Sequence, residues 1–248
     1  MDKKIRKIIN LFSLLLFPIT LNFFSPYLAI NGAVNGVICG SVLLFTFMFI
    51  TGLFFKRAWC SWVCPMAALS DFCMEINNNR VDIKKFRIIR YIIFILWIVF
   101  LITAFFVNGI KTINPLYLTD NGISVNMPNR YVIYYGILLL FILVNILIGK
   151  RGSCHSFCWM SPFLVGGAKL GKILRIPQLQ VKFNSSTCVE CGLCSKKCPM
   201  SIDISSCSEL GYIDSQDCIL CGECINFCKK NIFSYILVDN STKLKGVD

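Results

Sequence analysis

The chain has 248 residues, of which 56% are hydrophobic and only 15% are charged, and its formal net charge is +12. A soluble domain carries about 25% charged residues, so the deficit indicates segments that lie in lipid, where a charge is costly. Residues 1–182 hold 19 basic and 5 acidic residues (a balance of +14), whereas residues 183–248 hold 6 and 8 (−2). This distribution is typical of basic loops on a membrane protein and argues against nucleic acid as a partner.

Four apolar runs approach the length of about 20 residues that a helix needs to cross a bilayer. They cover residues 8–30, 37–55, 91–107 and 131–148. The basic segment 1–7 leads directly into the first run, which predicts a membrane anchor and no cleaved signal peptide. Pro18, Asn22 and Pro26 interrupt this run, although membrane helices tolerate proline better than soluble helices do.

Charges between the runs predict the orientation of the chain. Lysines and arginines crowd the N-terminal tail and the segments after the second and fourth runs: Lys3, Lys4, Arg6, Lys7, Lys56, Arg57, Arg80, Lys84, Lys85, Arg87, Arg90, Lys150 and Arg151. Residues 31–36 carry no charge, and residues 108–130 carry only Lys111, Asp120 and Arg130. By the positive-inside rule, both termini and the 56–90 segment face the cytoplasm of a multi-pass protein.

An internal repeat links the segments after the second and fourth runs. KRAWCSWVCPMAAL (residues 56–69) aligns with KRGSCHSFCWMSPF (residues 150–163), and the Lys-Arg pair, both cysteines and the methionine coincide. Each copy follows the second member of a pair of apolar runs. The membrane part is therefore predicted to consist of two parallel two-helix units, each ending in a cytoplasmic Cys-x3-Cys motif.

Fifteen cysteines pose a choice between disulfides and metal ligation. Disulfide scaffolds are short secreted domains that rarely bunch cysteines at two-residue gaps. Eight of these cysteines fall into two tightly spaced runs: Cys188-x2-Cys191-x2-Cys194-x3-Cys198-Pro199 and Cys218-x2-Cys221-x2-Cys224-x3-Cys228. This bunching favours metal ligation in a reducing compartment.

The spacing resembles that of bacterial ferredoxins with two [4Fe–4S] clusters, in which the fourth cysteine of each run ligates the other cluster. The resemblance covers about residues 183–235. It assigns Cys188, Cys191, Cys194 and Cys228 to a first cluster, and Cys198, Cys218, Cys221 and Cys224 to a second. Lys229 stands where proline is expected, which changes a packing detail and removes no ligand. Two four-cysteine zinc sites are a poor alternative, because zinc ribbons separate their cysteine pairs by longer spans.

The two Cys-x3-Cys motifs of the repeat supply a further candidate site, composed of Cys60, Cys64, Cys154 and Cys158. Residues four apart share a helix face, and the nearby Lys-Arg pairs favour thiolates. These cysteines would hold a third metal centre of the iron–sulfur type or act as redox thiols. The alternative is that they are small buried residues at the membrane boundary. Three remaining cysteines fit no motif and are predicted to be structural: Cys39, Cys73 and Cys207.

KRAWCSWVCPMAAL, its weaker copy, the four apolar runs and the C-terminal two-cluster domain together resemble the NapH/NosR/CcoG family of membrane polyferredoxins, over about residues 35–235. Residues 60–65 match the Cys-x3-Cys-Pro signature of this family in full, whereas the second copy has Trp159 in place of proline. Larger members carry a flavin domain or a further C-terminal domain. We expect this chain to have room for neither, which favours a small NapH-like quinol dehydrogenase subunit.

The resemblance implies an electron-transfer protein of a bacterial or archaeal cytoplasmic membrane, with the clusters on the cytoplasmic side. Its expected partners are menaquinol or ubiquinol and a partner oxidoreductase or ferredoxin-like protein. An assembly or maturation factor that uses clusters and thiols to reduce or deliver a metal is the alternative. The predicted fold is a membrane all-α bundle of about four transmembrane helices (residues 1–182) followed by a small α+β ferredoxin domain (residues 183–248).

Two other features have competing interpretations. His155 is the only histidine and lies between Cys154 and Cys158. It is predicted to be a solvent-facing loop residue, and the alternative is a titratable group beside a quinone pocket. Residues 164–176 predict either an interfacial helix on the inner membrane surface or a linker that packs on the cysteine-rich domain.

Overall fold

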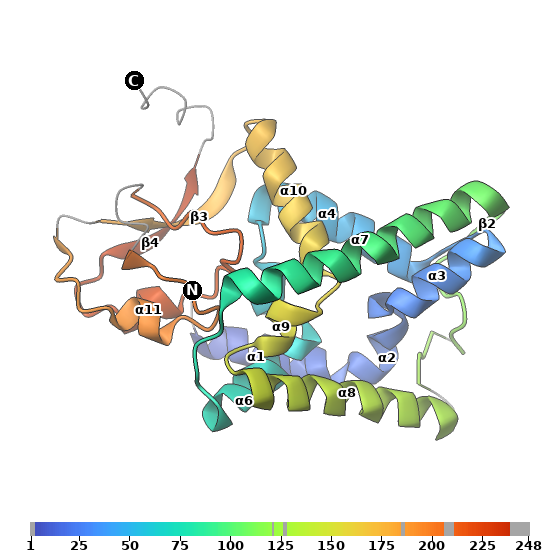
Figure 1. Ribbon diagram of the computed structural model, residues 1–248, viewed down its shortest axis with the longest axis horizontal. Coiled ribbons are helices and arrows are strands. Elements are labelled where there is room, and N and C mark those ends of the chain that lie inside the picture. The colour runs from blue at the N-terminus through green and yellow to red at the C-terminus, as the bar shows by residue number, and fades with distance from the viewer. Residues whose placement is uncertain (1–2, 121, 126–127, 185–186, 206–210, 239–248) are drawn as a thin grey trace.

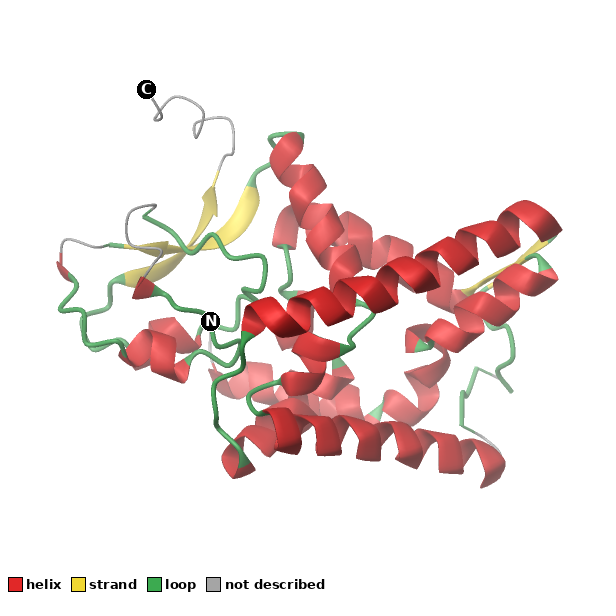
Figure 2. Cartoon of the chain, in the orientation of Figure 1, coloured by secondary structure: helices red, strands yellow, loops and turns green. Residues whose placement is uncertain are grey.

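The computed structural model describes residues 3–120, 122–125, 128–184, 187–205 and 211–238. Helices form a bundle, and a small ferredoxin-type domain packs against one end of it (Figure 1, Figure 2). The bundle consists of α1 (Lys3–Leu15), α2 (Phe17–Thr20), the 3-10 helix η1 (Leu21–Phe24), α3 (Pro26–Asn35), β1 (Val37–Cys39), α4 (Gly40–Phe55), α5 (Trp59–Trp62), α6 (Pro65–Ile76), α7 (Ile83–Asn108), β2 (Thr112–Asn114), α8 (Pro128–Ile148), α9 (Gly152–Ser156) and α10 (Ser161–Ile173). The ferredoxin domain consists of β3 (Gln178–Phe183), α11 (Leu193–Lys197), α12 (Glu223–Phe227) and β4 (Phe233–Val238).

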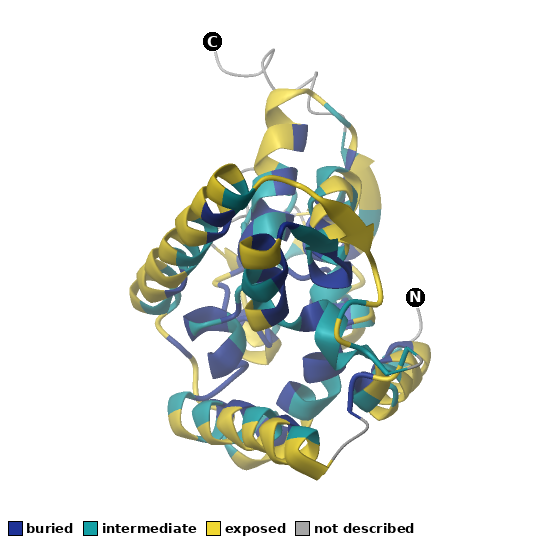
Figure 3. Ribbon diagram, turned by 90° about the vertical axis from the view of Figure 1, so that its right-hand side faces the viewer, coloured by how far each residue is buried: buried dark blue, intermediate teal, exposed yellow. Residues whose placement is uncertain are grey.

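Two helices, α7 and α8, are long and apolar enough to cross a membrane, and they match the third and fourth predicted runs. Much of their outward surface is exposed apolar side chain, whereas buried residues gather toward the centre of the bundle (Figure 3). Helix α1 and the segment 17–24 pass the same test only as a pair bent by 57°, and α4 is apolar but 16 residues long. The described residues therefore contain two candidate spans, or three with the bent pair, and the predicted four are not confirmed.

The first apolar run is broken by its prolines. Pro18 lies in the first turn of α2, and Pro26 begins α3 directly after Ser25, whose Oγ accepts a hydrogen bond from the Leu28 N–H (3.3 Å). Proline offers no N–H to the preceding turn, and the serine cap satisfies the new helix start. The chain consequently bends here and turns Phe17 and Phe24 into the core of the bundle.

Two small two-stranded sheets lie at opposite ends of the molecule (Figure 1). Strand β1 pairs in parallel with β2, and β3 pairs antiparallel with β4 from Gln178↔Val238 to Phe183↔Phe233. Because the whole of β3 belongs to this second sheet, the ferredoxin domain begins at Gln178, ahead of the predicted boundary at residue 183.

The two sequence repeats fold alike and exchange packing partners. In each repeat an apolar helix (α4 or α8) is followed by a short cysteine-bearing helix (α5 or α9) and then by a third helix (α6 or α10). Helix α4 packs against α10 of the other repeat, and α8 packs against α6. This exchange brings Arg151, before α9, to within 3.1 Å of the Cys60 carbonyl in α5, to which its Nη1 donates.

Helices α4 and α10 approach each other closely through glycines. A Cβ added to Gly52 would lie 2.8 Å from the Leu164 carbonyl oxygen, and one added to Gly167 would collide with the Phe49 carbonyl oxygen. Small residues allow helix backbones to come together in this way in membrane proteins. Helix α10 is thus a core element of the bundle. Residues 164–176 also contact the ferredoxin domain, where Lys172 pairs with Asp214 (2.9 Å), as the linker interpretation predicts, and the interfacial position stays a prediction.

Candidate metal centres

The first predicted cysteine set shares one cavity of the ferredoxin domain. Cys188, Cys191, Cys194 and Cys228 all border this space of about 370 Å³. The first three lie in the loop before α11 and in α11 itself, and the fourth directly follows α12. Three cysteines of one run thus meet the last cysteine of the other, which is the grouping that the spacing predicts. Cys191 is exposed, so this set lies at the surface of the domain.

The second predicted set borders a separate, narrower cavity: Cys198, Cys218, Cys221 and Cys224. Burial is the main cause that raises the pKa of Cys198 to about 12, and the neighbouring charge of Cys221 adds to it. The backbone N–H groups of Met200 and Ile202 donate to the Cys198 sulfur and oppose this rise. Buried thiols with such donors suit a positively charged metal cluster, which would hold them as thiolates.

The loops of the two halves have matching backbone geometry. Glu190 and Leu220, each one residue before a cysteine, have φ of 50° and 53°. Gly192 and Gly222, each one residue after the same cysteines, have φ of 67° and 75°. Turns of this kind direct successive backbone N–H groups toward one concave side, where they favour negative charge. The loops are therefore shaped to donate hydrogen bonds to thiolate and sulfide sulfur.

The four cysteines of the repeat also come together. Burial raises the pKa of Cys64 well above 9.0, and the nearby charges of Cys60, Cys158 and Cys154 raise it further. Burial likewise raises the pKa of Cys158 to about 12, with added contributions from Cys154 and Cys60. The exchange of helices between the repeats thus creates one four-cysteine site, which is called the repeat site below. Metal binding there stays a prediction.

Buried polar groups beside the repeat site fit an iron–sulfur cluster. Arg57 is 1% exposed, and its Nε and Nη2 have no hydrogen-bond partner, nor does Nε2 of the buried His155. Unsatisfied buried donors are costly, and a group rich in sulfide would accept from them. Burial alone would lower the pKa of Arg57, but the negative charges at Cys60 and Asp217 outweigh burial and raise it. The repeat site thus combines four thiols with a fixed cation.

A single-ion site does not match these arrangements. Across the described residues, no three cysteine, histidine or carboxylate side chains converge closely enough to hold one metal ion. Zinc needs its thiolates on one ion, whereas a cubane cluster spreads them over separate irons.

The repeat site adjoins the second ferredoxin set. Cys60 packs against both the core of the bundle and the core of the ferredoxin domain. Ser61 Oγ donates to the Ile219 carbonyl (2.6 Å), and Trp62 Nε1 donates to the Leu220 carbonyl (3.3 Å). Ile219 and Leu220 separate Cys218 from Cys221 in the chain. The three cysteine sets thus run from the bundle, through the second ferredoxin set, to the exposed first set.

Buried ion pairs fix the ferredoxin domain to the bundle, and sequence reasoning missed them. Asp217, directly before Cys218, is fully buried and accepts hydrogen bonds from three arginines: Arg57 (2.9 Å), Arg87 (2.6 Å) and Arg90 (3.1 Å). Glu223 binds Arg6 Nη2 (2.7 Å) and Lys3 Nζ (2.9 Å). In the sequence, only the repeated Lys-Arg prefix pointed to these ion pairs, and its positive charges were interpreted as loop charges.

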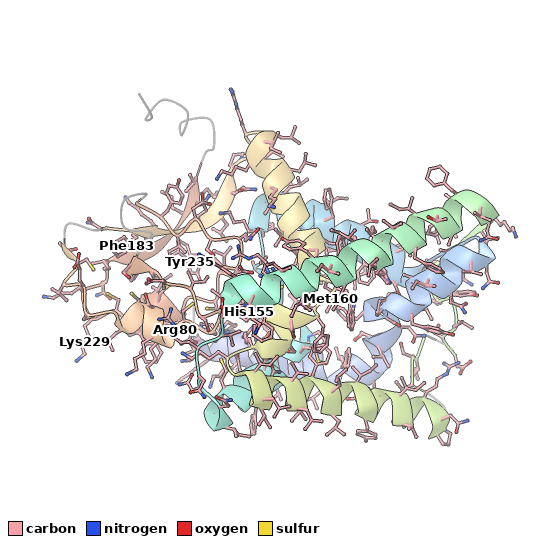
Figure 4. The ribbon with its side chains drawn as sticks, in the orientation of Figure 1. Arg80, His155, Met160, Phe183, Lys229 and Tyr235 are labelled. Carbon is pink, nitrogen blue, oxygen red and sulfur yellow. The ribbon has the colours of Figure 1, made fainter. Side chains whose placement is uncertain are left out.

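His155 is not the solvent-facing loop residue that was predicted. It lies in α9 and is 1% exposed, and Figure 4 places it between α7 and α8 near Met160. Burial, together with Arg57, Arg90 and Arg151, lowers its pKa from 6.5 to about 3, although the carboxylate of Asp217 opposes this shift. The prediction failed because α7, from a distant part of the sequence, packs against α9, as does the neighbouring α8.

An apolar cavity of about 580 Å³ lies next to the repeat site. Its lining includes Pro65 and Met66, which follow Cys64, and Phe157 and Trp159, which flank Cys158. The bend of the first apolar run lines another side, with Phe17, Leu21 and Phe24 among others. A few polar groups, among them Asn22, Ser124 and Arg130, complete the lining. Pockets of this size and character bind apolar ligands that carry a polar group.

Two family models match the chain. A model described as a 4Fe-4S binding domain matches residues 38–81, which contain the first Cys-x3-Cys motif, and one described as a 4Fe-4S dicluster domain matches residues 187–233. They support iron–sulfur clusters in both parts of the molecule.

Curated relatives match over most of the chain. An uncharacterized protein of Methanocaldococcus jannaschii is 26% identical over 88% of this chain and 81% of its own length. The putative electron transport protein YccM of Escherichia coli is 24% identical over 79% of this chain, which spans about half (56%) of YccM. The ferredoxin-type protein NapH of Escherichia coli is 26% identical over 91% of this chain and 78% of its own length. No solved structure matches.

Proposed function

Because the chain belongs to the NapH-like polyferredoxin family, we propose that it relays electrons between a membrane quinol, menaquinol or ubiquinol, and a partner redox protein. The two cysteine sets of the ferredoxin domain would each bind a [4Fe–4S] cluster, and the repeat site would bind a third iron–sulfur centre. Bound clusters supply one-electron steps, so a quinol that gives up two electrons and two protons is oxidised in two such steps.

The apolar cavity beside the repeat site carries this proposal. Pro65, which follows Cys64, and Phe157 and Trp159, which flank Cys158, all line the cavity. A lipid-soluble quinone suits a space lined by Phe17, Phe141 and Trp159, and the Trp159 indole is held by its hydrogen bond to the Phe24 carbonyl (3.0 Å). A quinone in this cavity would thus lie at the membrane-side end of the row of three cysteine sets.

The orientation of the chain completes the proposal. The candidate span α7 begins beside the ferredoxin domain and runs away from it, and α8 runs back toward that end of the bundle (Figure 1). The positive-inside distribution would put the ferredoxin domain in the cytoplasm. Electrons would then pass between the quinol in the bundle and a partner on the cytoplasmic side.

The direct test is reduction of the protein by quinol. The protein is purified anaerobically in detergent and mixed with a reduced menaquinone analogue, and the clusters are followed by EPR with dithionite as the control. We expect cluster signals with quinol that match part of the dithionite signal. Signals with dithionite alone would overturn quinol oxidation and favour either electron flow toward quinone or the assembly-factor alternative.

A further inference from the structure

Most described carboxylates of the ferredoxin domain pair with the bundle, whereas its described lysines are exposed. Three of its described carboxylates, those of Asp214, Asp217 and Glu223, form ion pairs with cations of the bundle. Its described lysines are instead all exposed: Lys182 on β3, and four lysines in α11 or after α12, Lys196, Lys197, Lys229 and Lys230. Contact with the bundle thus neutralises much of the acidic charge, and the outward side of the domain is left basic.

Lys196 and Lys197 lie in α11 with Cys194, and Lys229 and Lys230 directly follow Cys228. Lys229 and Lys230 border the cavity that Cys188, Cys191, Cys194 and Cys228 share. Lys197 Nζ lies 4.9 Å from the ring centre of Phe227, which borders the same cavity. Figure 4 shows Lys229 at the end of the ferredoxin domain farthest from the bundle. Within the described part of this rim, Glu190 is the only acidic residue.

Apolar side chains occupy the middle of the same surface. Val189 is 64% exposed, Leu193 is 44% exposed and Phe227 is 39% exposed, and all three border the cavity of the first set. Cys191 is exposed among them. An apolar centre with a charged rim is the usual anatomy of a protein–protein interface.

We propose that this surface, formed by Val189, Leu193, Phe227 and the four lysines, docks a small acidic electron-transfer protein. The inference rests on the proposed electron-transfer function. It names the partner that exchanges electrons with the exposed first cluster. Opposite charge accelerates encounter, while a small interface allows rapid release, as electron exchange between soluble carriers requires. The reaction is the transfer of one electron between the first cluster and the partner's cofactor, and no bond forms or breaks on this chain.

The test uses the full-length protein in detergent, reduced with dithionite and then freed of excess reductant. Stopped-flow absorbance follows its oxidation by an acidic flavodoxin as the probe and by basic cytochrome c as the charge control. The variant K196E/K230E is compared with K84E/K85E, which has the same charge change at two exposed lysines near the start of α7. We expect the rate with flavodoxin to fall about tenfold or more in K196E/K230E and less than about twofold in K84E/K85E.

Salt supplies an independent measurement. In the wild-type protein the rate with flavodoxin should fall as salt is added, because screening weakens attraction between opposite charges. Equal flavodoxin rates in the two variants, or a wild-type rate that rises with salt, would overturn the proposal. EPR of each variant before mixing establishes that the clusters are intact, and if K196E/K230E lacks them the salt dependence decides. Fast, salt-sensitive reduction of flavodoxin by a protein that quinol cannot reduce would support the docking surface and refute the quinol role.

Discussion

Arg57 and Asp217 lie 160 positions apart in the chain and form a buried ion pair, with 2.9 Å between Nη1 and Oδ1. Arg57 precedes the first repeat cysteine by three residues, and Asp217 directly precedes the second ferredoxin run. Burial would raise the pKa of Asp217, but Arg57, Arg90 and Arg87 outweigh burial and lower it to about 2. The pair therefore fixes the repeat site against the ferredoxin domain, as short-range electron transfer requires.

Asp217→Asn should loosen this junction. Removing one partner of a buried ion pair leaves the other charge uncompensated and typically costs about 3–5 kcal/mol, and here three arginines lose their carboxylate. We expect a clear fall in the thermal midpoint of the detergent-solubilised protein, measured by loss of cluster absorbance. The control is Asp214→Asn: Asp214 is partly exposed and pairs with the half-exposed Lys172 and, at 3.6 Å, with Lys56, so its loss should cost clearly less than the loss of Asp217. Equal midpoints for the two variants would contradict the role of Asp217.

The pH dependence of the same pair has a definite sign. The pKa of Asp217 falls from 3.8 to about 2 on folding, so its contribution is complete above the unfolded value and is lost as pH falls toward about 2. The stability difference between wild type and Asp217→Asn should therefore stay constant between about pH 5 and 8. Thermal scans across this range check the expectation. A difference that shrinks steadily below pH 7 would show that another group titrates with the junction.

The repeat site should account for about a third of the bound iron, because three four-iron clusters are proposed. The double variant Cys60→Ser/Cys158→Ser should lose that fraction of iron and of acid-labile sulfide, while the EPR signals of the ferredoxin domain persist. Cys73→Ser is the matched control, since this thiol is also buried but fits no motif. If the iron content of the double variant equals that of the wild type, the four thiols hold no cluster and are a redox or structural group.

Sequence patterns predicted the features that depend on local spacing. The cysteine runs placed Cys188 with Cys228 and Cys198 with Cys218, because a ferredoxin loop encodes its ligands within a few residues. The repeat of Lys-Arg and Cys-x3-Cys likewise predicted that the two segments would be equivalent. Family matches bear out the polyferredoxin resemblance, whereas cluster ligation by these cysteines stays a prediction.

The sequence patterns did not predict features that depend on contacts between residues far apart in the chain. His155 has polar neighbours in sequence, and α7, from a distant part of the chain, packs on the helix that carries this buried residue. Hydropathy counted residues 8–30 as one span, yet Pro18 and Pro26 divide them into bent pieces. Arg57 was counted as a loop charge, although its carboxylate partner lies in the other domain. Cysteine 207 lies outside the described residues, so its predicted structural role stays a prediction.

Membrane topology can be tested with fused reporters. If the positive-inside distribution holds, alkaline phosphatase fused after Lys111 should be active, because the segment between α7 and α8 would face outward. The same enzyme fused after residue 248 should be inactive, and green fluorescent protein at that position should fluoresce. The opposite pattern would place the ferredoxin domain outside the cytoplasm and remove its proposed cytoplasmic partner.

Filling the apolar cavity should block quinol without disturbing the clusters. Ile137 on α8 lines this cavity, whereas Leu139, two residues further along the same helix, is exposed on its surface. Ile137→Trp places an indole in the space proposed for the quinone headgroup, and Leu139→Trp places one at the lipid surface as a matched control. We expect the rate of cluster reduction by a menaquinol analogue to fall about tenfold or more in Ile137→Trp only, because a ligand cannot enter an occupied pocket. Reduction by dithionite should be unchanged in both variants, since it needs no membrane pocket. If Ile137→Trp accepts electrons from quinol as fast as Leu139→Trp does, quinol reaches the clusters by another route, and the cavity is not its site.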